Sequence, residues 1–99
     1  MRRIIDGMCY DTDKATAVTS RSTKGSGIRD IGFLTETLYK TSRGNWFLVG
    51  IGGQFTPYCG LLEAPGAEKL FPLTSKDAQV WLEMHAQELV EYHFPYEEA

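Results

Sequence analysis

The sequence predicts an α+β fold: a small antiparallel β-sheet, centred on a hairpin over residues 34–53, packed by a C-terminal helix over residues 75–93. Two observations predict these elements. Residues 35–41 and 45–51 are rich in Thr, Tyr, Trp, Phe, Leu and Val, which suit strands, and a short turn containing Gly44 separates them. Near the C-terminus, apolar residues recur every three or four positions, as on one side of a helix. With 99 residues, we expect the chain to form a single domain with one modest core.

The hairpin turn is predicted to be the three-residue loop 42–44, because Gly44 readily adopts the left-handed conformation that closes such a loop. This loop sets the register, which pairs Lys40 with Trp46, Tyr39 with Phe47, Leu38 with Leu48 and Thr37 with Val49. Alternation then gives one face with Tyr39, Phe47, Val49 and Ile51, and a second face with Leu38, Leu48 and Trp46. Because both faces are apolar, other elements must cover both.

Shorter segments supply the remaining strands. Residues 3–6 and 8–10 flank Gly7 and predict either a first strand pair or one bent strand. A turn capped by the side chain of Asp11 follows. Three further segments complete the expectation: a strand over 16–19, a mobile basic loop over 20–30, and a last strand over 68–73 that Pro72 stops.

A helix-start signal precedes the C-terminal helix. Thr74 or Ser75 can accept hydrogen bonds from free backbone amides, and Asp77 suits the positive end of the helix dipole. The predicted apolar stripe consists of Ala78, Trp81, Leu82, His85, Leu89 and Tyr92. Two alternatives remain for 75–93: one continuous helix, or two short helices separated by a break near His85.

Composition narrows the class of protein. With 42% hydrophobic and 23% charged residues, the chain is typical of an ordinary globular domain and not of a disordered one. It has neither a run of about 18 apolar residues nor a signal-peptide pattern, so we expect a cytoplasmic location. Cys9 and Cys59 are expected to be small buried hydrophobic residues, although their redox state, including a disulfide between them, stays open.

The net charge of −3 is unevenly distributed. Residues 1–44 contain eight Lys or Arg and five Asp or Glu, whereas residues 45–99 contain two and eight. From position 77 onward there is no Lys or Arg, and the acidic residues are Asp77, Glu83, Glu88, Glu91, Glu97 and Glu98. Carboxylates spaced along a helix can imitate the phosphates of DNA; the alternative is a merely solvated helix surface.

Other chemistry has weaker support. His85 and Glu88 are one helical turn apart, but no HExxH motif accompanies them, so no metal or other cofactor is expected. Cys9 or Cys59 with a histidine would offer a nucleophile and a base, yet nothing local marks either thiol as activated. The basic residues of loop 20–30 could contact nucleic acid, although the overall acidity argues against it.

Three motifs resemble a family of small proteins carried by bacterial phages, plasmids and integrative elements. They are I-I-D-G-x-x-Y-D-T-x-x-A at 4–15, L-Y-K-T-x-x-G-N-W-F-L-x-G-x-G-G at 38–53, and F-P-L-T-x-x-D-A-x-x-W-L-E at 71–83. Some proteins of this type are anti-CRISPR inhibitors. The resemblance implies that this protein is one of them, and it implies no active-site positions, because that class shares a function rather than catalytic residues.

The functional hypothesis is therefore a non-enzymatic anti-CRISPR inhibitor of the host cytoplasm that binds a bacterial CRISPR-Cas surveillance complex and blocks its binding of target DNA. We expect an exposed Trp46 or Tyr39 to supply an apolar anchor. The DNA-mimicking carboxylates would be Asp77, Glu83, Glu88, Glu91, Glu97 and Glu98. Two alternatives are a small nucleic-acid-binding accessory protein that uses loop 20–30, and an enzyme built on Cys9 or Cys59 with His85. The sequence leaves the oligomeric state and the targeted subunit open.

Overall fold

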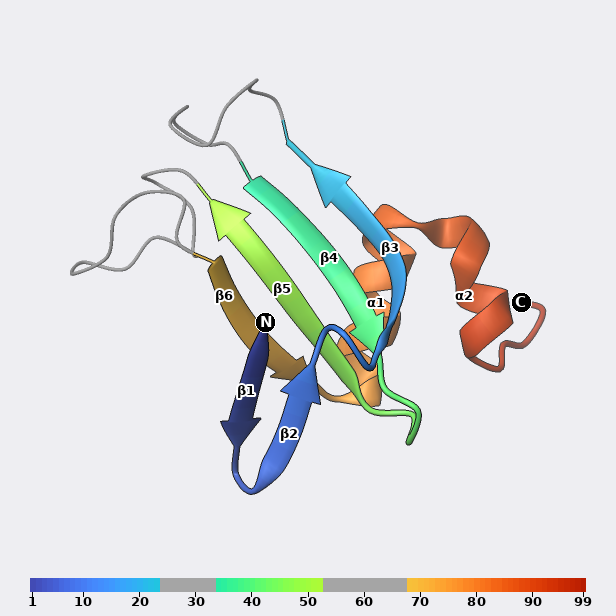
Figure 1. The fold of residues 1–99 in the computed structure, drawn as a ribbon. Helices are drawn as coiled ribbons and strands as arrows, with labels where there is room; N and C mark the ends of the chain where they lie inside the picture. The colour runs from blue at the N-terminus through green and yellow to red at the C-terminus, as the bar shows by residue number, and fades with distance from the viewer. Residues whose placement is uncertain (24–33, 53–67) are drawn as a thin grey trace.

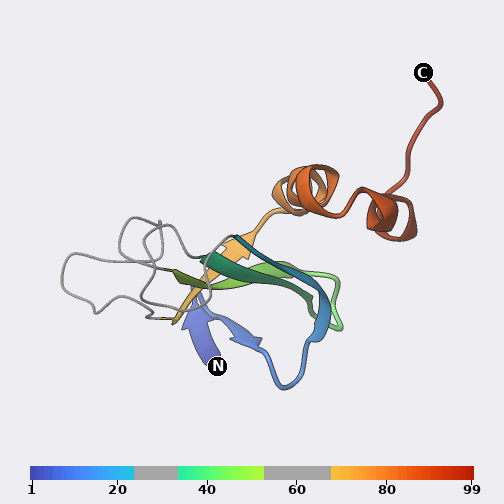
Figure 2. The same ribbon diagram turned by 90° about the horizontal axis from the view of Figure 1, so that it is seen from above.

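The computed structural model describes residues 1–23, 34–52 and 68–99, and it confirms the α+β class (Figure 1). The elements are β1 (Arg2–Ile5), β2 (Met8–Asp11), β3 (Thr16–Ser22), β4 (Leu34–Lys40), β5 (Trp46–Gly52), β6 (Glu68–Leu73), α1 (Ser75–His85), η1 (Gln87–Leu89) and α2 (Val90–His93). Strands β3-β4-β5-β6 form one antiparallel sheet in this order, and β1 and β2 form a separate hairpin. The helices lie on one side of the four-stranded sheet and the β1–β2 hairpin lies on the other (Figure 2).

The central hairpin has the predicted register. Strand β4 pairs with β5 from Leu34 opposite Gly52 to Lys40 opposite Trp46, and all four predicted pairs occur. Gly44 has a positive φ of 86°, which residues with a side chain rarely adopt. The Thr41 amide donates to the Asn45 carbonyl at 2.8 Å, and the Gly44 amide donates to the Thr41 carbonyl at 2.9 Å. The predicted loop geometry is therefore confirmed.

Both predicted apolar faces are buried, each under a different element. The first, called the helix-covered face, buries Leu34, Leu38, Trp46 and Leu48 against Ala78, Trp81, Leu82, Ala86 and Val90. The second, called the hairpin-covered face, buries Phe47, Val49 and Leu70 under Met1, Ile5, Tyr10 and Ala15, with Tyr39 beside Phe47 on the same face. One strand, β5, thus contributes to both halves of the core, which explains why its residues 46–50 are all buried.

Residues at the N-terminus form a strand pair rather than one bent strand. Asp6 and Gly7, between β1 and β2, both have positive φ values of 52° and 77°, as a two-residue type I′ turn requires. The turn after β2 follows the expected pattern, because the Asp13 amide donates to Oδ1 of Asp11 at 3.0 Å. The hairpin is fastened to the sheet through the ring of Tyr10, which contacts the edge of Phe47 at a centroid distance of 5.5 Å.

Strand β3 is longer than predicted. It continues to Ser22, so residues 20–22 belong to the sheet and not to a loop; residues 24–30 lie outside the described part of the chain. The Ser22 and Thr35 hydroxyls lie within hydrogen-bonding distance at 3.1 Å. Polar residues mark a loop poorly here because β3 is an edge strand with much of its surface in solvent. The last strand, β6, is confirmed, and its Pro72 is tolerated because β6 is the other edge.

The C-terminal segment takes the broken form of the two predicted alternatives. Thr74 caps α1 by accepting a hydrogen bond from the Asp77 amide at 3.0 Å, and α1 ends at His85 because Ala86 leaves helical geometry with φ −150° and ψ 61°. The break redirects the apolar stripe after Leu82. Ala86 and Val90 are buried, whereas His85 is exposed and Tyr92 is 75% exposed. The prediction that His85 and Tyr92 belong to the stripe is therefore wrong.

Candidate functional site

The candidate site is the acidic ridge, which consists of Asp77, Glu83, Glu88, Glu91, Glu97 and Glu98. All six side chains are exposed. They lie on α1, η1, α2 and the tail that follows, the layer above the helix-covered face (Figure 2). Within residues 1–23, 34–52 and 68–99, none of the six forms an ion pair; the ion pair found there joins Arg21 and Glu36. The ridge therefore presents carboxylates that are free to meet a basic surface.

Part of the ridge is brought together around a shallow hollow. Glu83 on α1 and Glu97 in the tail both line it, together with Gln79 and Tyr96. The Gln79 side-chain amide donates to Oε2 of Glu83 at 3.2 Å, which holds this carboxylate against the helix. Residues far apart in the sequence thus place two negative charges at one hollow.

The remaining carboxylates are distributed along the same layer. Glu88 and Glu91 are three positions apart on consecutive helical turns, so their Cβ atoms are neighbours at about 5–6 Å. Asp77 and Glu83 are six positions apart on α1, which separates them by about 120° around the helix axis. Asp77 and Glu83 therefore point to different sides of α1, and Glu98 follows Glu97 in the tail.

The expected aromatic anchors do not join the ridge. Trp46 is only 3% exposed, because Phe94 stacks on its ring at 5.3 Å and the His93 ring contacts it at 5.4 Å. The prediction of an exposed Trp46 is wrong, since the chain after α1 folds back over this end of the hairpin. Tyr39 stacks on Phe47 at 5.0 Å on the hairpin-covered face, which is the opposite side of the sheet from the ridge.

Three exposed apolar side chains on the ridge-bearing elements were missed. Tyr92, Met84 and Tyr96 are 75%, 70% and 63% exposed, and each lies within one or two positions of a ridge carboxylate. Tyrosine is common at energetically important positions in interfaces. The break at Ala86 is what exposes Tyr92, so a continuous-helix interpretation could not identify it.

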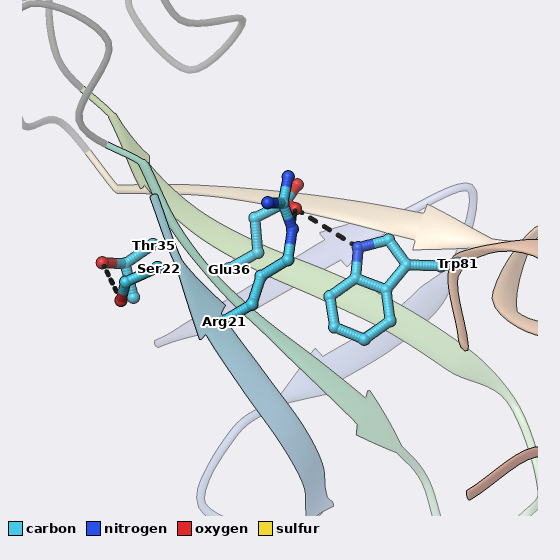
Figure 3. A network of polar contacts seen from close by, with 5 residues as sticks. All are labelled: Arg21, Ser22, Thr35, Glu36 and Trp81. Carbon is cyan, nitrogen blue, oxygen red and sulfur yellow. Dashed lines mark hydrogen bonds and ion pairs between the residues drawn. The ribbon is translucent and has the colours of Figure 1, made fainter. Parts of the chain in front are cut away.

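A buried polar network fixes α1, and hence the ridge, to the sheet (Figure 3). Glu36 on β4 is 7% exposed, and its Oε1 accepts from Arg21 Nε at 2.8 Å and from Trp81 Nε1 at 3.3 Å. The network therefore links β3, β4 and α1 through one carboxylate. Glu36 is not predicted as a buried site residue from the sequence, because a charged residue at a strand position is ordinarily solvent-facing.

The described residues do not place Cys9 and His85 close enough to form an active site. Cys9 is exposed on β2 rather than buried as expected, and β2 and α1, which carries His85, lie on opposite sides of the four-stranded sheet (Figure 2). Cys59 lies outside the described residues. Among the residues that are described, no three His, Cys, Asp or Glu side chains are grouped to hold a metal. In the same ranges, no helix combines the length and the apolar character needed to cross a bilayer.

Both histidines near the ridge should titrate below the usual value. Partial burial is the main cause that lowers the pKa of His85 and of His93 below 6.5, and Arg21 and Lys40 respectively lower them further. The unfolded chain then takes up protons at a higher pH than the folded protein. We expect the free energy of unfolding to fall as the pH is lowered from about 7.5 to about 5.5.

Histidine ring resonances followed by NMR check this prediction, with both midpoints expected below 6.5. The double variant His85→Gln, His93→Gln should flatten the pH dependence of unfolding in the same range. Midpoints at or above 6.5 would contradict the assignment of both rings to partly desolvated positions.

Comparisons of this chain with protein-family models, with curated proteins and with solved structures find no match. The resemblance to proteins of phages and mobile elements is carried by the three sequence motifs alone.

Proposed function

We propose that this protein is a non-enzymatic inhibitor that binds a basic, DNA-binding groove of a bacterial CRISPR-Cas surveillance complex through its acidic ridge. The observation that carries the proposal is the set of six exposed carboxylates on the helical layer and tail, none of them in an ion pair within the described ranges. The choice of a CRISPR-Cas complex, and of the host cytoplasm as the location, follows from the motif resemblance.

The chemistry of such an interface is electrostatic at first contact. A groove that binds DNA is lined by Lys and Arg, and a row of carboxylates matches the sign of the phosphates that the groove normally receives. Complementary charge steers association and makes its rate sensitive to salt. Glu83 and Glu97 supply the charges at the hollow, and Glu88 and Glu91 add two more on η1 and α2.

The apolar anchors of this interface lie on the C-terminal helices and tail and not on the central hairpin. Tyr92, Tyr96 and Met84 are exposed beside the carboxylates, so burial of these side chains on the partner can add affinity that charge alone does not give. They take the role that Trp46, being buried in the core, does not fill.

A competition assay with a matched pair of triple variants tests the proposal. One variant is Glu83→Gln, Glu88→Gln, Glu91→Gln; the other is Asp6→Asn, Asp13→Asn, Glu68→Gln, whose three exposed carboxylates lie on β1–β3 turns and on β6. Both remove three negative charges, so they share one net charge. The readout is displacement of labelled target DNA from a purified surveillance complex.

We expect the ridge variant to need about tenfold more protein for half-displacement, which corresponds to about 1.4 kcal/mol from three exposed charge pairs. The control variant should behave as the unmodified protein, and displacement should weaken as salt is raised. Equal losses in both variants would show that only net charge matters. No displacement by the unmodified protein would overturn the proposed target.

A nucleic-acid-binding accessory protein that uses the basic residues of segment 20–30 is the second candidate. Of that segment the structure describes residues 20–23, in which Arg21 is paired with Glu36. A gel-shift titration separates the two functions, because an acidic DNA mimic should not itself retain DNA.

A further inference from the structure

A cleft lies on the hairpin side of the molecule, away from the acidic ridge. It has a volume of about 310 Å³ and lies between β2, the turn that follows β2, and the loop that joins β4 to β5. Its lining includes Cys9, Asp11, Lys14, Ser42 and Arg43. Because the β1–β2 hairpin and the helices lie on opposite sides of the sheet, the cleft and the ridge are separate surfaces (Figure 2).

Positive charge predominates in the cleft. Lys14 and Arg43 both line it, both are exposed, and within the described part of the chain neither forms an ion pair. The single carboxylate of the lining is that of Asp11, and its Oδ1 already accepts a hydrogen bond from the Asp13 amide. The cleft therefore combines two cations with one hydrogen-bonded carboxylate, in line with the excess of Lys and Arg over Asp and Glu in residues 1–44.

Shape and side-chain chemistry narrow the class of ligand. Ligand pockets range from about 300 to about 1,000 Å³, so this cleft matches a small molecule better than a polymer. An Arg side chain offers a planar fork of donors to an oxyanion, and Lys adds a compact charge. Ser42 and Asn45, which both have polar side chains, belong to the same lining.

We propose that this cleft binds a small phosphorylated molecule, with its phosphate or pyrophosphate group held between Lys14 and Arg43. The loop that carries Arg43 is preorganised, because its turn is closed by the hydrogen bonds of Thr41, Gly44 and Asn45. The turn that carries Lys14 is closed by the Lys14 and Ala15 amides, which donate to the Asp11 carbonyl at 3.2 and 3.0 Å. Two rigid turns thus present the two cations.

Cys9 provides a reporter within the cleft, because its exposed thiol is part of the lining. Alkylation by iodoacetamide, which is uncharged, is followed by mass spectrometry on the peptide that contains Cys9, so that Cys59 does not contribute to the signal. Pyrophosphate is titrated at constant ionic strength. A parallel NMR titration follows the backbone amides of Gly7, Ser42 and Asn45, which line the same cleft.

We expect pyrophosphate to slow Cys9 alkylation at least about threefold, saturably, and to shift the three amide resonances. The double variant Lys14→Gln, Arg43→Gln should lose both effects. Its matched control is Arg3→Gln, Lys76→Gln, which removes two exposed cations outside the cleft and should keep both effects. Circular dichroism shows whether the variants retain the fold.

Three outcomes would overturn the proposal: no protection together with no amide shift, equal effects in the two double variants, or stronger protection by a single-stranded oligonucleotide than by pyrophosphate. The last result would identify nucleic-acid backbone as the phosphate source. None of these outcomes depends on the acidic ridge, so the displacement assay and the alkylation assay can fail independently.

Discussion

Replacing Phe47 by alanine is expected to lower the free energy of unfolding by about 3–5 kcal/mol, the range for truncating a buried aromatic side chain. The side chain is fully buried, at 0% exposed, and it joins the sheet to the N-terminal hairpin. Its ring stacks on Tyr39 at 5.0 Å and meets the ring of Tyr10 edge-on at 5.5 Å. Truncation therefore removes both aromatic contacts and leaves a cavity under the hairpin.

The loss should be local as well as global. Within the described residues, strands β1 and β2 pair only with each other, so packing on Phe47 and its neighbours is what holds them to the sheet. Hydrogen exchange should accelerate most at the amides of residues 2–11 in Phe47→Ala, because a two-stranded hairpin is marginally stable without such packing.

Leu38→Ala is the matched control, because Leu38 is also 0% exposed but belongs to the helix-covered face. It should cost about 2–5 kcal/mol by chemical denaturation, with the fastest exchange in the C-terminal helices. If both variants accelerated exchange in the same residues, the two halves of the core would not be separate units. Phe47→Leu, which keeps an apolar side chain, should show a smaller version of the Phe47→Ala pattern.

The fold was predictable where local chemistry decides it. Gly44 and the alternation around it fix the central hairpin and its register, and Thr74 fixes the start of α1, because each acts through neighbouring residues. The two apolar faces of β5 also follow from alternation alone. These features can be predicted without knowing which distant segment packs on each face of the sheet.

Features that depend on distant segments were not predictable in the same way. Trp46 becomes buried because residues 93 and 94 fold back onto it, and that return depends on the helix break at Ala86. Alanine has the highest intrinsic helix propensity of all residues, so helix propensity does not predict that the helix ends at Ala86. The carboxylates of the ridge could be predicted as exposed, but their grouping at the hollow could not, since Glu97 reaches Glu83 only through the folded-back tail.

Glu36 is the clearest case of a residue that only the tertiary structure identifies. On β4 it lies two positions from both Leu34 and Leu38, so all three side chains are on the helix-covered face. The alternation pattern alone would assign a hydrophobic residue to this position. Its burial is stable because two partners satisfy it, the guanidinium of Arg21 and the indole N–H of Trp81. The sequence separation of 45 between Glu36 and Trp81 is what hides the pair.

Glu36→Ala is therefore expected to destabilise the protein by about 2–3 kcal/mol, because it leaves the buried indole N–H of Trp81 without this acceptor and Arg21 without its counter-charge. The value lies below the range for fully buried pairs, because the Arg21 side chain is 28% exposed and can reach water. Glu36→Gln keeps an oxygen acceptor for Trp81 and should lose less. Chemical denaturation gives these differences directly.

The pKa of His85 offers an independent readout of the same network. Arg21 lowers this pKa and Glu36 raises it, so Glu36→Gln should shift the NMR titration of His85 to lower pH, whereas Arg21→Gln should shift it to higher pH. His93, whose pKa is lowered by burial and by Lys40, should stay unchanged in both variants and serves as the internal control. Shifts of the same sign in the two variants would contradict the opposing charge effects of Arg21 and Glu36 on the pKa of His85.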